Sequence, residues 1–287
     1  MPAEPTDLVP EPTDLVSEPT DLVSEPTDVV SEPAHLVSVI VPVYNERATV
    51  AEALRRIRRA PLPTSLQTEV VVVDDGSTDG SGKILGALED STVRVVTHPR
   101  NRGKGAAVRS GLQVARGDLV LLHDADLEYD PDDWPGLLEP LLGRKATVVY
   151  GSRFQGQGTM APSQRLVSRL VTLSANLLYR GALSDLQTGA KAFARQALDG
   201  LTLESDGFAF EAEITAKLLR QGHRIVEVPV TYRGRRARDG RKIRWRDAAA
   251  MAGALVRLRL DGVAPVTTSP STATAPTVPA MANDAEV

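Results

Sequence analysis

Residues 118–126 read DLVLLHDAD, an apolar run that ends in two closely spaced acids. An unbroken apolar run is typical of a strand buried on both faces, and such strands belong to parallel sheets. Because alternate residues of a strand point to the same side, we expect the carboxylates of Asp124 and Asp126 to face one site. Glu128 adds a third carboxylate if the extended geometry continues that far.

Other apolar runs along the chain alternate with segments whose apolar residues recur every three or four positions. The runs predict strands at 36–43, 69–75, 93–98, 118–126 and 146–152. The periodic segments predict helices at 46–60, 79–89, 104–115 and 133–142. This alternation predicts an α/β fold in which helices cover both faces of a mostly parallel central sheet. Ligands of such sheets bind beyond the carboxyl ends of the strands.

Polar residues gather at those strand ends. A helix N-cap accounts for Ser77 or Thr78, but it does not account for two adjacent acids, Asp74 and Asp75, at the end of an apolar strand. We expect these acids to accept hydrogen bonds from a ligand such as a base or ribose. The acids of 124–128 are closely set oxygen ligands of the kind that Mg²⁺ or Mn²⁺ prefers, with a solvent-exposed acidic loop as the alternative.

The composition excludes several classes of protein. The 287 residues contain no cysteine, which rules out a disulfide scaffold, a thiolate metal site and a cysteine nucleophile. No apolar stretch of about 18 residues predicts a transmembrane helix, and no secretory signal pattern is visible. We therefore expect a cytoplasmic protein. A phosphate loop is not expected at 76–83, because the spacing is wrong and Ile84 stands where Ser or Thr is needed.

Charge is divided unevenly along the chain. The net charge is -4, yet residues 1–35 contribute -9 and 261–287 contribute -3, which leaves +8 for 36–260. A basic body favours polyanionic partners such as phosphates, nucleic acid or an anionic membrane surface. We expect one domain at 35–260 between disordered tails at 1–34 and 261–287. The first tail repeats EPTDLVS with a helix-breaking proline in each copy, either as a neutral appendage or as a tail that folds back on the body.

A series of segments between residues 37 and 245 resembles glycosyltransferase family 2. The matching segments are VSVIVPVYNE (37–46), VVVDDGSTDGS (71–81), NRGKGAAVRSGLQVARGD (101–118), DADLEYDP (124–131), GSRF (151–154), SDLQTGAKAF (184–193), FAFEAEITAKLLRQGHRIVEVPVTYRGR (208–235) and GRKIRW (240–245). Within that family the chain is most similar to the polyprenyl- or dolichyl-phosphate mannose or glucose synthases. The resemblance implies the GT-A nucleotide-sugar-binding fold.

The resemblance also implies roles for residues on the donor side. Those expected to bind the nucleotide sugar are Pro42, Tyr44, Asn45, Glu46, Asp74, Asp75, Lys104, Asp124 and Gln187. Asp126 is expected to bind Mg²⁺ or Mn²⁺, with Glu128 and Asp124 as further ligands. In similar enzymes the position of Glu128 is often Gln.

Catalytic and acceptor roles are implied in the same way. Arg153 is expected near the phosphates, with a surface ion pair as the alternative. Asp185 is the first candidate for a base or a sugar-orienting carboxylate. Glu211 and Glu213 lie where many members of the family keep a base, although either can instead hold sugar hydroxyls or an arginine. The basic run 233–246 resembles a flexible acceptor loop, and its candidates for the acceptor phosphate, beside Arg153, are Arg233, Arg241 and Lys242.

The expected function is metal-dependent, inverting transfer of a hexose from a nucleotide diphosphate sugar, of GDP-mannose or UDP-glucose type, to a polyprenyl phosphate. One alternative is the same fold acting on a saccharide or small-molecule hydroxyl. Another is a catalytically silent nucleotide-sugar-binding or membrane-adaptor protein. No nucleic-acid partner is expected, because Trp245 is the only aromatic residue in the basic run and no recognised nucleic-acid fold accompanies it. Residues 245–260 predict either a core helix or a basic helix in peripheral contact with an anionic membrane at the inner face.

Overall fold

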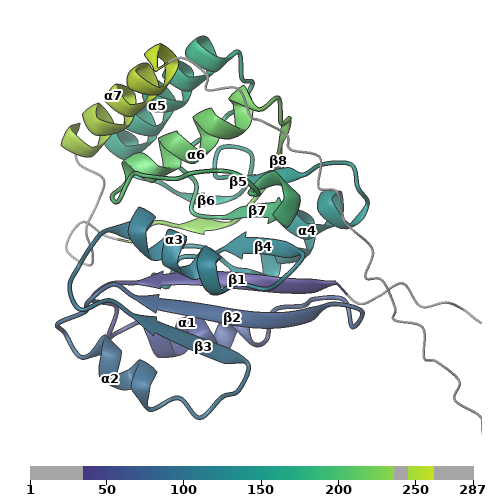
Figure 1. Ribbon diagram of the computed structural model, residues 1–287, viewed down its shortest axis with the longest axis vertical. Coiled ribbons are helices and arrows are strands. Elements are labelled where there is room, and N and C mark those ends of the chain that lie inside the picture. Colours follow the sequence, from purple (N-terminus) through teal and green to yellow (C-terminus); the bar gives the residue numbers. More distant parts are fainter. Residues whose placement is uncertain (1–34, 236–244, 262–287) are drawn as a thin grey trace, which may run out of the picture. The chain divides into compact units, whose positions relative to one another are not determined.

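The computed structural model describes residues 35–235 and 245–261. The expected tails therefore lie outside the described residues, apart from Asp261. A seven-stranded sheet forms the centre of the described part (Figure 1). Its strands are β1 (Leu36–Val43), β2 (Gln67–Asp74), β3 (Val93–Thr97), β4 (Leu119–Leu122), β5 (Val148–Ser152), β7 (Lys191–Ala194) and β8 (Ile225–Pro229).

The strand order in this sheet is β3-β2-β1-β4-β7-β5-β8. Strand β7 is antiparallel to both of its neighbours, and every other neighbouring pair is parallel. In a second, two-stranded sheet, β6 (Gly158–Thr159) pairs with β9 (Tyr232–Arg233). The predicted α/β fold with a mostly parallel sheet is confirmed.

Helices cover both faces of the large sheet and pack apolar side chains against it. On one face, α1 (Val50–Ile57), α2 (Ser81–Gly86) and α4 (Trp134–Leu142) pack in one apolar cluster. On the other face, α3 (Lys104–Val114) and α6 (Ala209–Arg220) pack in a second cluster. In α1 and α4 the spacing of the buried residues follows the helical period, as expected for one apolar stripe, whereas α6 is buried on nearly all sides.

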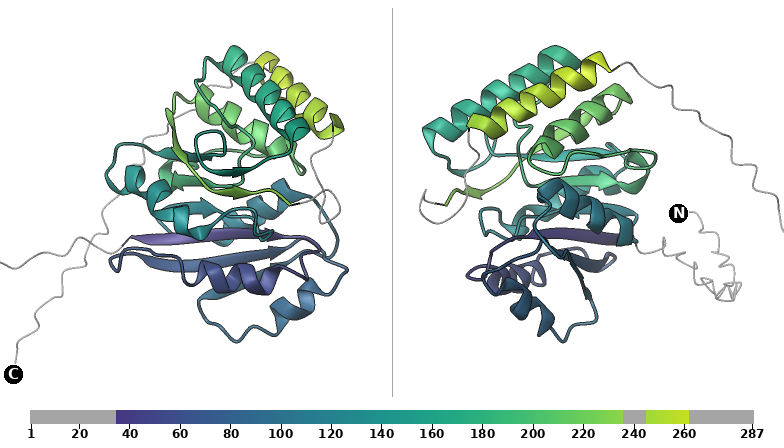
Figure 2. Two further views of the ribbon diagram at one scale, coloured as in Figure 1. Left: turned by 180° about the vertical axis from the view of Figure 1, so that it is seen from behind. Right: turned by 60° about the vertical axis from the view of Figure 1, so that its left-hand side comes forward.

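A third apolar cluster joins α6 to two long helices, α5 (Pro162–Tyr179) and α7 (Trp245–Leu260). α5 and α7 lie side by side over α6 at one end of the domain (Figure 2). Met251 and Leu255 of α7 are fully buried there. The core-packing alternative for 245–260 is therefore correct for one side of the helix.

The strand predicted at 118–126 is shorter than expected. β4 ends at Leu122, and the chain turns at Asp126 and Leu127, where Leu127 has a φ of 62°. The Asp126 carboxylate accepts a hydrogen bond from the backbone N–H of Glu128 (3.0 Å), which stabilises the turn. The expected alternation of Asp124 and Asp126 along an extended strand, with Glu128 continuing it, is therefore wrong.

Candidate active site

A pocket of about 640 Å³ opens beyond the carboxyl ends of β1, β2 and β4. From the predicted donor side it is lined by Pro42, Tyr44, Asn45, Glu46, Asp75 and Lys104. It is also lined by Gln187, a further predicted donor-side residue, and by Arg153 and Glu211 of the predicted catalytic set. The turn at 124–128, here named the acid turn, adds Asp124, Asp126 and Glu128. The fold thus brings to one place side chains that are widely separated in the sequence.

The loops after β1 and β2 hold each other through side-chain-to-backbone hydrogen bonds. Asn45 has a φ of 57°, and its side-chain oxygen accepts from the backbone N–H of Thr78 (2.8 Å). In return, the backbone N–H of Asn45 donates to Ser77 Oγ (3.0 Å), and that of Glu46 donates to Ser81 Oγ (2.9 Å). The serine hydroxyls that follow β2 therefore position the loop that follows β1.

Asp75 connects these loops to the segment that follows β3. Its carboxylate accepts from the backbone N–H groups of Arg102 (2.9 Å) and Gly103 (2.7 Å), and it contacts His98 Nδ1 (2.7 Å). Gly103 has a φ of 99°, and a Cβ there would run into the backbone carbonyl of Asp206. Asp75 both borders the pocket and fixes the wall formed by 101–103.

The acid turn concentrates negative charge at the pocket. Burial and the neighbouring carboxylates of Asp124 and Glu128 raise the pKa of Asp126 to about 7. Such crowding favours a positive group at this point. The structure places one there, because Arg235 Nη2 lies 3.3 Å from Asp126 Oδ2.

Arg235, which follows β9, bridges the first loop and the acid turn. Its guanidinium donates to both oxygens of Glu46, at 3.0 and 2.7 Å. Its backbone N–H donates to Glu128 Oε1 (2.7 Å), while Tyr232 Oη donates to Glu128 Oε2 (2.6 Å). Glu128 thus holds the segment 232–235 against the pocket.

A chain of alternating charges runs from the acid turn into the core. Lys104 Nζ contacts Asp124 (2.9 Å) and Glu211 (3.0 Å), and Glu211 also pairs with Lys191. Burial alone would raise the pKa of Glu211, but the two lysines lower it below its ordinary value. Burial and the charge of Lys104 lower the pKa of Lys191. At neutral pH Glu211 is therefore an ionised carboxylate between two amines.

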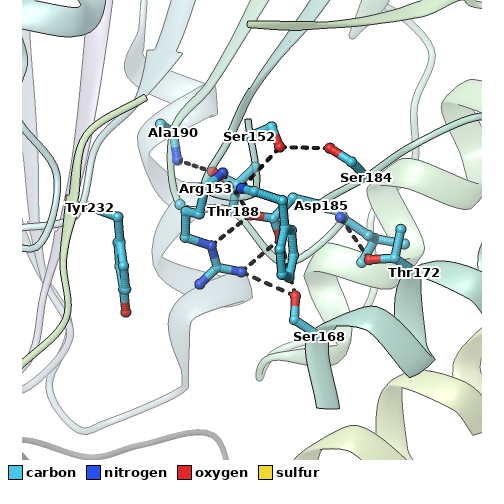
Figure 3. A network of polar contacts seen from close by, with 12 residues as sticks. Ser152, Arg153, Ser168, Thr172, Ser184, Asp185, Thr188, Ala190 and Tyr232 are labelled. Carbon is cyan, nitrogen blue, oxygen red and sulfur yellow. Dashed lines mark hydrogen bonds and ion pairs between the residues drawn. The ribbon is translucent and has the colours of Figure 1, made fainter. Parts of the chain in front are cut away.

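Arg153 enters the pocket directly after β5 and is bound from behind by Asp185 (Figure 3). Its Nε and Nη2 donate to the two oxygens of Asp185, at 2.6 and 2.7 Å. Ser168 of α5 accepts from Nη2 (3.2 Å), and the guanidinium lies 5.2 Å from the ring centre of Tyr232. Asp185 itself is fully buried and does not line the pocket. Because both side chains of the pair are buried, the alternative of a surface ion pair for Arg153 is wrong.

Several predicted residues lie elsewhere. Asp74 is buried below the pocket and accepts from the backbone N–H of Ser77 (2.9 Å). Glu213 accepts from the backbone N–H groups of Glu204 and Ser205 and from Lys217, so it holds a loop. Arg233 is exposed and lies 3.8 Å from Asp130. The predicted Arg241 and Lys242 fall outside the described residues.

The sequence analysis missed four side chains of this site. Arg235 was part of the basic run, but nothing marked it out from its neighbours. Tyr232 and Gln164 line the pocket, and Gln164 donates to Tyr232 Oη (3.2 Å). Lys191 was inside a matching segment, and a lysine at the start of the short apolar strand β7 was the available signal.

The chemistry of the acid turn fits a divalent cation only in part. No group of three or more His, Cys, Asp or Glu side chains converges among residues 35–235 and 245–261. Asp124 is paired with Lys104, and Glu128 is hydrogen-bonded to Tyr232 and Arg235. Asp126 fits best, since Mg²⁺ is commonly held by one or two carboxylates together with substrate phosphates.

Comparison with known proteins agrees with this geometry. The model of the family described as Glycosyl transferase family 2 matches residues 38–202. An undecaprenyl-phosphate mannosyltransferase of Micrococcus luteus is 35% identical over 207 residues, covering 68% of this chain and 83% of that protein. A polyprenol monophosphomannose synthase of Mycolicibacterium smegmatis is 32% identical, covering 68% and 76%. Some other relatives are longer, and the chain spans about half of their length.

Solved structures of similar fold include a sugar transferase with its ligands. Glucosyl-3-phosphoglycerate synthase of Mycobacterium tuberculosis, in complex with Mn²⁺, uridine diphosphate and glucosyl-3-phosphoglycerate, matches with a TM-score of 0.57 at 25% identity. The match covers 80% of each chain. In α/β sheets of this kind, ligands bind beyond the carboxyl ends of the strands, where the pocket of this chain lies.

The chain belongs to glycosyltransferase family 2. It is a glycosyltransferase, which sets aside the silent-adaptor alternative. Across the described residues, no helix is long and apolar enough to cross a membrane.

Proposed function

We propose that this glycosyltransferase moves a hexose from a nucleotide diphosphate sugar to a polyprenyl phosphate. Two relatives are named for sugar transfer involving undecaprenyl phosphate or polyprenol. The observation that carries the proposal is that each predicted base carboxylate already has a cationic partner. Asp185 pairs with Arg153, Glu211 with two lysines, and Glu213 with Lys217.

An acceptor phosphate suits such a pocket. A phosphate is ionised near neutral pH, so it needs no general base to become a nucleophile, whereas a hydroxyl does. Arg153 presents a fixed positive charge to the pocket, with its direction set by Asp185. A guanidinium held in this way orients a phosphate oxygen for attack, and proximity then supplies much of the rate.

The chemical step balances without a proton donor. A phosphate oxygen of the acceptor forms a bond to the anomeric carbon of the sugar, and the bond from that carbon to the diphosphate oxygen breaks. The nucleoside diphosphate leaves with the electron pair, and the anomeric configuration inverts. The loops 43–46 and 101–103, which Asp75 holds together, are proposed to bind the nucleotide.

Asp126 is proposed to hold Mg²⁺ or Mn²⁺, with Asp124 beside it. A divalent cation at this position neutralises charge that develops on the leaving diphosphate. Arg235 lies against Asp126 and Glu46 in this structure. Its positive charge occupies the same acidic surroundings, so Arg235 must shift when a cation and a diphosphate bind there.

The proposal is tested by incubating the purified chain with Mg²⁺, radiolabelled UDP- or GDP-hexoses and a short-chain polyprenyl phosphate in detergent. Label that enters the organic phase with one donor supports the proposal and identifies the sugar. The matched acceptor control is the corresponding polyprenol, which lacks the phosphate and should accept nothing. Donor binding without any lipid product contradicts the proposed acceptor.

A second candidate function is transfer to a small-molecule hydroxyl. It is favoured by the structural match to an enzyme that was solved with glucosyl-3-phosphoglycerate. In that case one of Asp185, Glu211 or Glu213 must be freed from its cation to act as base. Offering 3-phosphoglycerate beside the polyprenyl phosphate in the same assay separates the two functions.

A further inference from the structure

Two neighbouring helices present apolar side chains to solvent. α5 and α7 lie side by side (Figure 2), and their inner sides share one buried cluster. Away from that cluster, leucines of α5 recur at spacings of four, three and four residues, and α7 adds two further apolar residues. These six residues, here named the leucine face, are Leu166, Leu170, Leu173, Leu177, Val256 and Leu260.

The exposure of the leucine face is large. The four leucines of α5 are between 53% and 74% exposed, and Leu260 is 77% exposed. Elsewhere in the described part of the chain, the exposed large apolar side chains are Tyr44 (41%), which lines the pocket, and Val95 (36%), and both are less exposed than the leucine face. Such a concentration on two adjacent helices is typical of an interaction surface and not of scattered surface residues.

Charges beside the leucine face are mainly positive, with Asp261 directly after Leu260 as the exception. Arg165 and Arg169 are exposed on α5, and Arg257 and Arg259 are exposed in the last turn of α7. Neither α5 nor residues 248–260 contain an acid. Leucines flanked by arginines match an anionic bilayer, where the leucines enter the acyl boundary and the guanidinium groups meet lipid phosphates.

A second copy of the chain matches this surface less well. A symmetric dimer pairs the same patch from both subunits. It would bring Arg165 and Arg169 of α5 and Arg257 and Arg259 of α7 close to their counterparts, and neither α5 nor residues 248–260 contain an acid to compensate. The charge pattern therefore favours a membrane as the partner.

The helices that carry the leucine face also contribute to the pocket. Gln164 of α5 and Met251 of α7 line it, and Ser168 of α5 accepts a hydrogen bond from Arg153. A bilayer in contact with the outer side of these helices would lie next to the wall of the pocket that holds Arg153. A lipid-borne phosphate then has only a short path to that arginine.

We propose that the leucine face docks this enzyme on the surface of an anionic membrane. The proposal deepens the proposed function and rests on it for the reason why a bilayer is the partner, since a polyprenyl phosphate acceptor resides in one. Docking itself needs no donor, acceptor or metal. It can therefore be measured separately from sugar transfer.

The experiment uses flotation of the full chain with vesicles of equal parts phosphatidylglycerol and phosphatidylcholine, without nucleotide sugar or polyprenyl phosphate. The variant Leu170→Gln/Leu173→Gln/Leu177→Gln should bind at least about tenfold more weakly, because three apolar side chains no longer enter the bilayer. Val95→Gln, an exposed apolar residue on β3, is the matched control and should bind like the original chain. Arg165→Gln/Arg169→Gln should weaken binding and reduce its dependence on salt.

Circular dichroism and the thermal midpoint establish that the variants are folded, which is expected because the changed side chains are exposed. Undiminished flotation of the leucine variant overturns the proposal, as does failure of the original chain to bind anionic vesicles. A dimer of the original chain that becomes a monomer in the leucine variant assigns the face to a second copy and also overturns it. Transfer in detergent, measured separately, decides the proposed function whatever the vesicles show.

Discussion

The two sides of the pocket are held together by different kinds of contact. On the donor side, carboxylates and hydroxyls accept from or donate to backbone groups of adjacent loops, as Asp75 does with 102–103. On the opposite side, charged side chains pair with charged side chains, as Arg153 does with Asp185. The first kind of contact fixes the shape of loops, and the second fixes the position of charge.

The difference has an energetic consequence. A hydrogen bond from a backbone N–H contributes about 1 kcal/mol net, and more when the acceptor is charged. Breaking a buried ion pair by removing one partner costs more, because an uncompensated charge stays in the interior. Substitutions on the side of Arg153 and Asp185, here named the charged side, should therefore affect both folding and catalysis. Substitutions on the donor side should mainly affect nucleotide binding.

The largest effect is expected at Asp126, where the two sides meet. Asp126→Asn should reduce transfer by about 1,000-fold, because the proposed cation no longer neutralises the leaving diphosphate. Binding of Mn²⁺ in the presence of nucleoside diphosphate, followed by electron paramagnetic resonance, should weaken in parallel. The control Asp132→Asn changes an exposed acid of the neighbouring turn and should change neither quantity. Full activity of Asp126→Asn would contradict the assignment.

The next effect is expected at the buried pair on the charged side. Asp185→Asn should lower the free energy of unfolding by about 3–5 kcal/mol, since Arg153 keeps its charge without its partner. Urea denaturation followed by circular dichroism measures this loss. The double variant Arg153→Met/Asp185→Leu should recover much of the stability but none of the transfer activity. A loss below 1 kcal/mol for Asp185→Asn would show that solvent reaches the pair.

A smaller effect is expected at the equivalent point of the donor side. Asp75→Asn should cost about 1–3 kcal/mol, because a neutral amide is a weaker acceptor for the N–H groups of Arg102 and Gly103. The nucleotide dissociation constant, measured by isothermal titration, should rise. Acceptor affinity should stay as it is in the original chain. If Asp75→Asn weakened the binding of nucleotide and of acceptor equally, the distinction between the two sides of the pocket would be wrong.

The smallest effect on transfer is expected at Glu213. Its substitution tests whether this carboxylate only holds the loop at 204–205 or also takes part in catalysis. Burial raises its pKa, but the amine of Lys217 and backbone N–H groups lower it below its ordinary value. Its contribution to stability is therefore present at neutral pH and is lost as the pH falls through the pKa of the folded state. Glu213→Gln should flatten the acid decline of stability below about pH 5 by roughly 1 kcal/mol.

The matched control for that measurement is Glu204→Gln, which changes an exposed acid in the loop that Glu213 holds. Its stability should follow the same pH curve as the original chain. Transfer by Glu213→Gln at neutral pH should fall much less than transfer by Glu211→Gln. Of these two glutamates, only Glu211 lines the pocket, and it forms an ion pair with Lys104. A comparable collapse of both activities would return Glu213 to the candidates for a base.

Much of the fold was predictable from sequence because its determinants are local. The strand expected at 36–43 coincides with β1, and the helix expected at 104–115 ends one residue beyond α3. Apolar periodicity reports which side of an element is buried, and strand ends in a parallel sheet converge by geometry alone. For that reason the sequence indicated that Tyr44, Asn45 and Asp75 lie at strand ends beside one site, and all three line the pocket. The turn at Asp126 was missed, because a positive φ at a leucine has no sequence signal.

The sequence by itself determined the alternation of strands and helices as far as β5, the family and the edge of the sheet where the site lies. Tertiary structure alone decided which charges meet there. Arg235 reaches Glu46 across 189 residues, and Lys191 reaches Glu211 only because β7 and α6 pack against each other. The physical reason is range: periodic burial acts over a few residues, whereas the partner of a buried charge is set by the packing of distant elements.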